Sequence, residues 1–303
     1  MPDIGIIGGR VVPVKKVAVS GASGFIGRHV LAELARHPLE IIAATQDAAQ
    51  LANTAKNIQV VELDLANPQS GDYERLHRPD VLIHLAWAGL PNYKSLHHFE
   101  TELPRQYLFL KGLVEAGLPA LLVTGTCFEY GMQSGALSED LIPLPCTPYG
   151  YAKDALRRQL EFLRENRPFN LTWARLFYMY GEGQPKSALF SQLKAAVARN
   201  EPAFNMSGGE QLRDFLPVIE VASTLVKLAF RHEDIGVVNV CSGKPISVRN
   251  LVEGWLKDNG WTIKLNLGHY DYPDYEPMVF WGDNDKLKKI LGNTNESTDF
   301  IND

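Results

Sequence analysis

Apolar and polar positions alternate along the first half of the chain in a pattern typical of α/β proteins. Short apolar runs of strand length are separated by longer amphipathic segments of helical length. The apolar runs cover residues 17–19, 41–44, 60–63, 81–85 and 121–123. This alternation predicts an α/β, Rossmann-type, doubly wound parallel sheet with helices on its faces.

Two further segments have the length of helices. In residues 99–117, Pro104 favours a helix start nearby, because proline lacks an amide hydrogen, and Gly117 is a stop signal. The second segment covers residues 149–165, and an apolar strand-like run follows at 171–177. The buried face of the first helix is predicted to include Leu108, Phe109, Leu113 and Val114.

The pattern becomes irregular after Tyr178, where glycines and prolines interrupt it. We therefore expect two lobes. A dinucleotide-binding domain would cover residues 16–177 plus 214–242, and a smaller substrate-binding lobe would cover 178–213 plus 243–303. Residues 1–15 are expected to form an N-terminal extension, to which we assign no function.

Composition narrows the range of functions. The 303 residues contain 30 basic and 35 acidic side chains, for a net charge of −5 and no long run of one sign, so neither nucleic acid nor an anionic membrane is an expected partner. The three cysteines are far apart and lack CxxC spacing, which fits a reducing, cytoplasmic setting. We expect no metal site, signal peptide or membrane span.

The first strand leads into a glycine-rich turn, SGASGFIG, followed by helical periodicity. Strand, tight turn and helix together can hold a dinucleotide, because glycine allows close backbone approach and a helix N-terminus attracts a diphosphate. The spacing is GxxGxxG and not GxGxxG, so an ordinary glycine-rich turn is the alternative. The expected contacts in this turn are Gly21, Ser23, Gly24, Phe25, Ile26 and Gly27.

The ends of the next strands would face the rest of the cofactor. Thr45 stands where an acid favours NAD and a base favours NADP, and neither it nor nearby Arg28 would repel a 2′-phosphate. The prediction is therefore NADP(H), with NAD(H) possible. Asp64 and Leu65 are expected beside the adenine, although Leu65 could equally be a core residue. Further expected cofactor contacts at strand ends are Leu85, Ala86 and Thr124.

Three residues could perform proton chemistry. Tyr149 and Lys153 are four residues apart in a predicted helix and so share a face, where the ammonium would lower the pKa of the phenol. Such a phenol can exchange a proton with a carbonyl or alcohol oxygen. Thr126 ends a strand and could hydrogen-bond the same oxygen; a simple strand cap is the alternative.

These motifs together resemble the extended short-chain dehydrogenase/reductase family, of the NAD-dependent epimerase/dehydratase type that acts on nucleotide sugars. The resemblance extends from Val17 to about Gly292 and includes, in family order, VAVSGASGFIG, VVELDL, VLIHLAWAG, VTGTCFEYG, TPYGYAK, ARLFYMYGEGQ, EQLRDFLPVIEVA and NVCSGKPISVRNL. It implies a nicotinamide cofactor and catalytic Thr126, Tyr149 and Lys153. It also implies that Lys153 holds the nicotinamide ribose.

Four further positions bear on the substrate. Arg213 matches the arginine that usually contacts the sugar nucleotide's diphosphate, with a surface salt bridge as the alternative. Cys127 and Phe128 stand where dehydratases carry an acid, which argues against a 4,6-dehydratase. Tyr178 stands where members of the family often have an asparagine that contacts the nucleotide. The expected substrate-binding residues are Thr126, Cys127, Tyr178 and Arg213.

The resemblance favours an NAD(P)-dependent 4-ketoreductase acting on a nucleotide-linked 4-keto-6-deoxyhexose in deoxysugar or surface polysaccharide biosynthesis. A dTDP sugar is the first expectation, and GDP or CDP sugars are possible. The alternative is a nucleotide-sugar 4-epimerase that uses the same residues with tightly held NAD. A third hypothesis is a nucleotide-sugar or dinucleotide sensor without catalytic activity. The presence of Thr126, Tyr149 and Lys153 argues against it. The family also implies a homodimer formed through residues 99–117 and 149–165.

Overall fold

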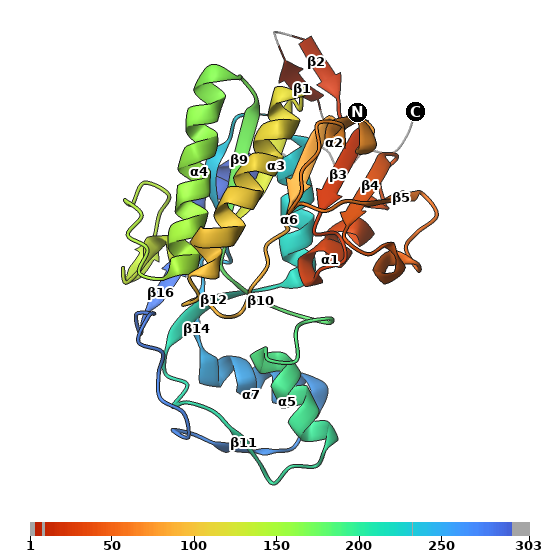
Figure 1. The fold of residues 1–303 in the computed structure, drawn as a ribbon. Coiled ribbons are helices and arrows are strands. Elements are labelled where there is room, and N and C mark those ends of the chain that lie inside the picture. Colours follow the sequence, from red (N-terminus) through yellow and green to blue (C-terminus); the bar gives the residue numbers. More distant parts are fainter. Residues whose placement is uncertain (1–3, 8–9, 232, 293–303) are drawn as a thin grey trace.

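The computed structural model describes residues 4–7, 10–231 and 233–292. Its larger lobe is built on a seven-stranded parallel sheet with the strand order β13-β9-β7-β6-β3-β4-β5 (Figure 1). The strands are β3 (Lys16–Ser20), β4 (Glu40–Thr45), β5 (Ile58–Glu62), β6 (Val81–His84), β7 (Ala120–Thr126), β9 (Asn170–Leu176) and β13 (Gly236–Val240). The predicted fold class is confirmed.

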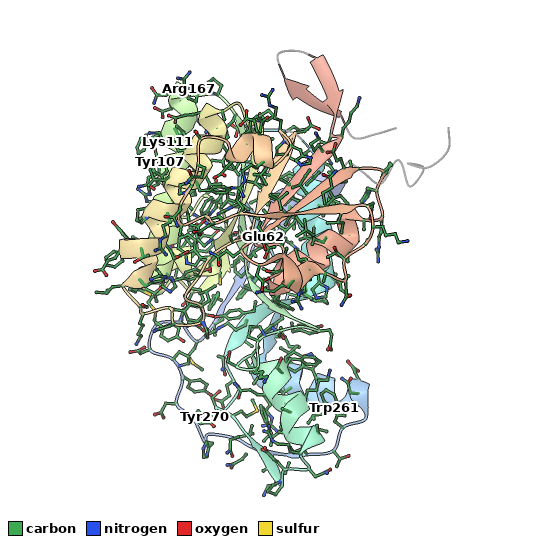
Figure 2. The ribbon with its side chains drawn as sticks, turned by 45° about the vertical axis from the view of Figure 1, so that its right-hand side comes forward. Glu62, Tyr107, Lys111, Arg167, Trp261 and Tyr270 are labelled. Carbon is green, nitrogen blue, oxygen red and sulfur yellow. The ribbon has the colours of Figure 1, made fainter. Side chains whose placement is uncertain are left out.

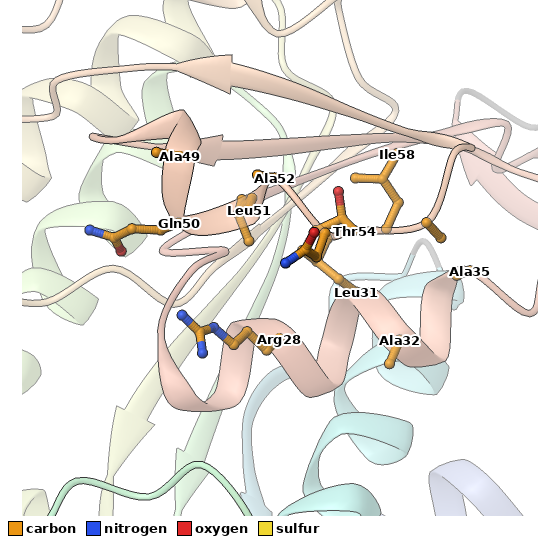
Figure 3. Close-up of a pocket in the computed structure, with 12 residues that line it drawn as sticks. Arg28, Leu31, Ala32, Ala35, Ala49, Gln50, Leu51, Ala52, Thr54 and Ile58 are labelled. Carbon is orange, nitrogen blue, oxygen red and sulfur yellow. The ribbon is translucent and has the colours of Figure 1, made fainter.

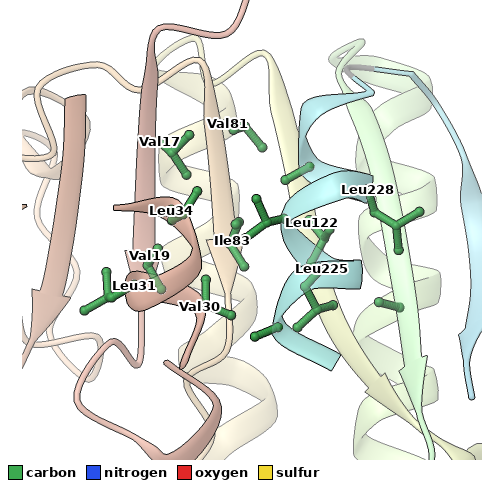
Figure 4. Close-up of a cluster of buried hydrophobic side chains, with 14 of the residues drawn as sticks. Val17, Val19, Val30, Leu31, Leu34, Val81, Ile83, Leu122, Leu225 and Leu228 are labelled. Carbon is green, nitrogen blue, oxygen red and sulfur yellow. The ribbon is translucent and has the colours of Figure 1, made fainter. Parts of the chain in front are cut away.

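Alternating strand residues bury opposite faces of this sheet. Val17 and Val19 pack with α1 (Phe25–Leu34) and α6 (Val218–Phe230), as Figure 4 shows. Ala18, between them, belongs to the second core cluster, with α3 (Leu103–Glu115) and α4 (Pro148–Asn166). Since side chains in a strand point alternately to the two faces, each central strand contributes to both cores.

The helix predicted over residues 99–117 consists of two parts. A π-helical turn, η2 (His98–Glu102), leads into α3, whose first turn contains Pro104 as expected. The predicted buried face is right for Phe109, Leu113 and Val114 and wrong for Leu108, which is 55% exposed. Leu108 is one residue from Phe109, and neighbouring residues in a helix point about 100° apart.

The smaller lobe has its own sheet and core. The sheet has the order β10-β12-β14, formed by β10 (Tyr178–Tyr180), β12 (Leu212–Pro217) and β14 (Pro245–Ser247). The helices α5 (Leu189–Ala198) and α7 (Val248–Asn259) lie beneath it in Figure 1, with β11 (Ala203–Asn205) and β15 (Lys264–Asn266) paired at the far end. Their apolar side chains, among them Leu193, Phe204 and Trp255, form a separate core.

The chain then returns to the larger lobe, a path that the expected lobe boundaries did not include. Strand β16 (Phe280–Gly282) pairs with β8 (Gly135–Leu137), and α8 (Asp285–Gly292) inserts Leu287 into the core beside the sheet. Near the N-terminus, β1 (Ile4–Ile7) pairs with β2 (Arg10–Pro13) in antiparallel orientation. The remaining short elements are η1 (Ala48–Leu51), α2 (Asp72–Arg75) and η3 (Cys127–Tyr130). In the described part of the chain, no helix combines the length and hydropathy needed to cross a bilayer.

Candidate active site

A cavity of about 550 Å³ opens at the carboxyl ends of the central strands, next to the smaller lobe. This is the edge at which doubly wound sheets bind ligands. Ten of the predicted site residues line it: Phe25, Ile26, Leu85, Thr124, Thr126, Cys127, Tyr149, Lys153, Tyr178 and Arg213. The fold thus brings the predicted catalytic, substrate and part of the cofactor residues to one place.

The glycine-rich turn packs so closely that side chains would not fit. Gly21 has φ +72°, and a Cβ there would lie 2.7 Å from the Ala86 amide nitrogen. A Cβ at Gly27 would collide with the carbonyl oxygen of Gly21. Helix α1 begins directly after Gly24, so its free N-terminal amides face the mouth of the turn. The turn and helix therefore fit a dinucleotide diphosphate.

The predicted adenosine-side residues lie outside the 550 Å³ cavity, at the ends of β4 and β5. Thr45 is buried and its hydroxyl donates to Ser23 Oγ at 3.1 Å, which ties β4 to the glycine turn. Asp64 is exposed, and hydrogen bonds from Asn67 and the Ala66 amide lower the pKa of its carboxyl group. Leu65 is buried in the core, as the alternative reading had it.

Local capping places the three proton-chemistry residues. Thr126 ends β7 and caps η3, where its Oγ1 accepts from the Phe128 amide at 3.3 Å. Thr147 caps α4 in the same way, so that Tyr149 lies in the first turn of the helix and Lys153 one turn later. A Cβ at Gly150 would lie 2.5 Å from the Phe128 carbonyl oxygen. Glycine thus lets α4 approach η3 closely, and the Thr126 hydroxyl lies near enough to lower the pKa of the Tyr149 phenol.

Burial controls the charge of two of these residues. It raises the pKa of Tyr149, aided by Tyr93 and Glu129, while the Thr126 hydroxyl acts in the opposite direction. The sequence pattern predicted a decrease, whereas burial holds the pKa of this phenol above its ordinary value. Burial also lowers the pKa of Lys153 to about 7, although Glu129 and Glu102 favour its charged form. The Lys153 Nζ donates to the Thr124 carbonyl oxygen at 2.9 Å.

Glu129 holds the backbone at Thr126 in place through a hydrogen bond. Its carboxylate accepts from the Thr126 amide at 2.8 Å and from Arg175 Nε at 2.6 Å, and also from the indole of Trp173. Glu129 and Arg175 are completely or almost completely buried. This carboxylate is therefore structural, and it is already paired, so it is not a free base at the substrate.

Arg213 lines the cavity but is not a surface residue. Its guanidinium forms a buried ion pair with Glu276 at 2.9 Å and packs over the Phe280 ring at 4.4 Å from the centroid. Burial, followed by the Glu276 charge, raises the pKa values of the Cys127 thiol and of Tyr178. Both groups therefore stay protonated near neutral pH, and a diphosphate at Arg213 would have to share it with Glu276.

Several cavity residues were not singled out as site residues from the sequence. Trp87, Tyr93 and Phe128 surround Tyr149, with ring centroids 6.1, 5.6 and 6.1 Å from that phenol ring. Trp87 could have been found, because it follows a strand end in the family-like segment VLIHLAWAG. Glu276 carried no such signal, because it lies 63 residues from Arg213 in an irregular segment.

A second cavity, of about 450 Å³, lies between α1 and the segment that contains η1 (Figure 3). Its walls are mainly small and aliphatic side chains, with Arg28 and Gln50 at one end. Arg28 is exposed, and its guanidinium forms no ion pair with any carboxylate of the described residues. Gln50 comes shortly after Thr45, the last residue of β4, and the ribose of a dinucleotide adenosine is expected at this strand end.

Comparison with known proteins adds independent information. Residues 17–241 match the model of a family described as the NAD dependent epimerase/dehydratase family. A dTDP-6-deoxy-L-talose 4-dehydrogenase (NAD(+)) from Aggregatibacter actinomycetemcomitans is 28% identical over 268 residues, which cover 88% of this chain and 98% of that protein. A dTDP-6-deoxy-L-talose 4-dehydrogenase (NAD(P)(+)) from Kitasatospora kifunensis is 27% identical over 256 residues, or 81% and 79% of the two chains. The solved structure of MoeE5 in complex with UDP-glucose and NAD has a TM-score of 0.77 at 28% identity and covers 91% of this chain and 92% of its own.

Proposed function

The chain belongs to the NAD dependent epimerase/dehydratase family, and from this premise we propose that it is an NAD(P)H-dependent 4-ketoreductase of nucleotide-linked 4-keto-6-deoxyhexoses. A dTDP sugar is the first candidate, and GDP and CDP sugars follow. One observation carries the proposal. Thr126, Tyr149 and Lys153 line one cavity with the start of α1, and two carboxylates beside it, Glu129 and Glu276, are already paired with arginines.

In this proposal a bound nicotinamide supplies the hydride. Tyr149 gives its proton to the oxygen at C4, and Thr126 holds that oxygen by a hydrogen bond. Because burial raises the pKa of Tyr149, the phenol carries its proton at neutral pH, which suits the reductive direction. The charged form of Lys153 stabilises the phenolate that remains. The buried site also strengthens each of these interactions by excluding water.

The wall beside Tyr149 supports a 6-deoxy sugar. The cavity lining includes Leu90, Pro91, Cys127 and the stacked rings of Tyr93 and Phe128, whose centroids are 4.6 Å apart. Such an apolar surface favours a methyl group at C5 of the sugar and disfavours a carboxylate, whose desolvation it would not compensate. The dTDP-6-deoxy-L-talose relatives are consistent with this choice.

We propose NADP(H) as the preferred cofactor, with NAD(H) as a possible second. Thr45 adds no negative charge at the ribose, and the exposed Arg28 guanidinium, which no carboxylate of the described residues pairs with, would meet a 2′-phosphate. The relatives are named for NAD(+) in one case and NAD(P)(+) in the other, so they support both cofactors.

We further propose a homodimer in a reducing, cytoplasmic compartment. Leu108 on α3 and Tyr151 and Phe162 on α4 are 55%, 55% and 65% exposed, an apolar surface suited to helix pairing. Figure 2 shows Tyr107 and Lys111 of α3 on the same outer edge as Arg167, which follows α4. Cys127, Cys146 and Cys241 are all free thiols. Light scattering tests the dimer, and a monomer would contradict it.

The reaction is tested by mixing the protein with NADPH or NADH and a dTDP-4-keto-6-deoxyhexose. We expect a stoichiometric loss of absorbance at 340 nm. In Tyr149→Phe we expect turnover to fall by about 10² or more while cofactor binding persists, because only the general acid is lost. Interconversion of sugars without net cofactor oxidation would instead support the alternative, a 4-epimerase with tightly held NAD. Unchanged turnover in Tyr149→Phe would exclude Tyr149 from the mechanism.

A further inference from the structure

Lys153 is a buried ammonium whose position depends on neutral groups. It is 2% exposed, and no carboxylate of the described residues lies within ion-pair distance of it. One hydrogen bond joins its Nζ to the Thr124 carbonyl oxygen. On another side, the face of the Trp87 indole lies 4.0 Å from the ammonium, measured to the ring centroid. An aromatic face attracts a cation most strongly where water is excluded.

Trp87 is itself held in a defined position. Its Nε1–H donates to His98 Nδ1 at 3.1 Å, and His98 Nε2 donates to the Asn92 carbonyl oxygen at 2.8 Å. The next residue, Ala88, donates its amide to Glu102 Oε2 at 3.1 Å. His98 and Glu102 are both buried and begin and end the same π-helical turn, η2. Two buried side chains of one turn therefore fix the indole and the backbone beside it.

We propose that Trp87 is a positioning residue for Lys153, and that the neutral His98 imidazole holds the indole face against the ammonium. The inference rests on the proposed function, in which Lys153 acts on Tyr149, and on the role in holding the nicotinamide ribose that the family resemblance implies for Lys153. Trp87 also lines the cavity, but in this proposal its effect on the reaction passes through Lys153. Its ring meets Tyr149 edge to face at 6.1 Å between centroids, so the Trp87 indole borders both residues of the Tyr-x-x-x-Lys pair.

The hydrogen bond that holds the Trp87 indole against Lys153 is sensitive to protonation of His98. An imidazolium carries hydrogens on both nitrogens, so Nδ1 would no longer accept from Trp87. The titratable groups around His98 are His97 and Glu102 on its own segment and Tyr149 and Lys153 on α4. Burial lowers the pKa of His98 from its ordinary value. The hydrogen bond from Trp87 to His98 should therefore persist at neutral pH and be lost on acidification.

The first test measures the dissociation constant of NADPH, and of NADH, by calorimetry. Trp87→Leu removes the aromatic face and should weaken binding about tenfold, whereas Trp87→Phe keeps a face and should change it less than about threefold. Trp281→Leu makes the same substitution on β16, outside the cavity, and should bind as the wild type does. Equal affinities for Trp87→Leu and the wild type would overturn the proposal.

The second test needs neither substrate nor cofactor. Tryptophan fluorescence is followed on acidification, and the transition caused by His98 should appear in the wild type and be absent from Trp87→Phe and from His98→Asn. His98→Asn keeps an acceptor near the Nδ1 position, so it should also retain NADPH affinity at neutral pH, whereas His98→Leu should lose it. A transition that persists in His98→Asn would overturn the proposal, even if Trp87→Leu does not fold. If these patterns hold while no keto sugar is reduced, the proposed reaction fails and the positioning role stands.

Discussion

Arg175 and Lys153 are both cations buried near the carboxyl edge of the sheet, yet their surroundings differ. Arg175, on β9, is 1% exposed and is paired with the equally buried Glu129. Burial opposes its charge, but Glu129 raises the pKa of Arg175 overall. Lys153, on α4, has a carbonyl oxygen and an indole face as neighbours, and burial lowers its pKa to about 7.

The difference separates a structural charge from a charge that can change. Glu129 is fully used by Arg175, the Trp173 indole and the Thr126 amide, so it acts on Lys153 only from a distance. A paired charge fixes the backbone that carries Thr126. An unpaired ammonium with a pKa near the working pH is suited to chemistry, and perturbed pKa values of this kind cluster at functional sites.

Removing Arg175 should have the largest effect on stability. In Arg175→Met the buried Glu129 carboxylate loses its partner, so we expect the free energy of unfolding to fall by about 3–5 kcal/mol. Urea denaturation followed by circular dichroism measures this change. Arg199→Met, which breaks only the exposed pair with Glu201, is the matched control and should cost at most about 1 kcal/mol. A similar loss in both variants would remove the distinction between the two kinds of ion pair.

Replacing Lys153 should increase the stability of the protein, whereas replacing Arg175 should decrease it. Lys153→Met removes an unpaired buried charge, so we expect the free energy of unfolding at pH 6 to rise by about 1–2 kcal/mol while turnover is lost. The folded-state pKa of about 7 lies below the ordinary 10.5, so the wild type bears the full penalty below pH 7 and regains stability as the pH rises from 7 towards 10.5.

The stability difference between Lys153→Met and the wild type should therefore be greatest at pH 6 and smaller at pH 9. Urea unfolding at the two pH values provides the comparison, and titrating groups that do not interact with Lys153 cancel in the difference. If Lys153→Met were instead less stable than the wild type at pH 6, the ammonium would contribute to the fold in the way that Arg175 does.

Arg28 provides the smallest effect on stability, because it is exposed and makes no ion pair with a described carboxylate. Arg28→Ala should change the free energy of unfolding by no more than about 0.5 kcal/mol. NADPH affinity should nevertheless fall about tenfold, since a charge-assisted contact with the 2′-phosphate would be lost, and NADH affinity should stay the same. Calorimetric titration of both cofactors measures this. A strong preference of the wild type for NADH would refute the cofactor proposal.

The sequence by itself determined the features that depend on neighbours along the chain. Apolar runs gave the order of strands and helices, Pro104 gave the start of α3, and the spacing of Tyr149 and Lys153 placed them on one helix face. Glycines at 21 and 27 marked a turn whose backbone packs too closely for any Cβ. Backbone sterics and helical periodicity act over a few residues, so such patterns can be interpreted without coordinates.

Only the tertiary structure decided which charges meet and which remain alone. Glu129 and Arg175 are 46 residues apart in the chain, and Arg213 and Glu276 are 63 apart, yet each pair is buried in contact. The same folding left Lys153 beside Trp87 with no carboxylate partner among the described residues, and burial raised the pKa of Tyr149 where the sequence predicted a decrease. Desolvation and ion pairing depend on distances in space, which a pattern of residue types does not specify.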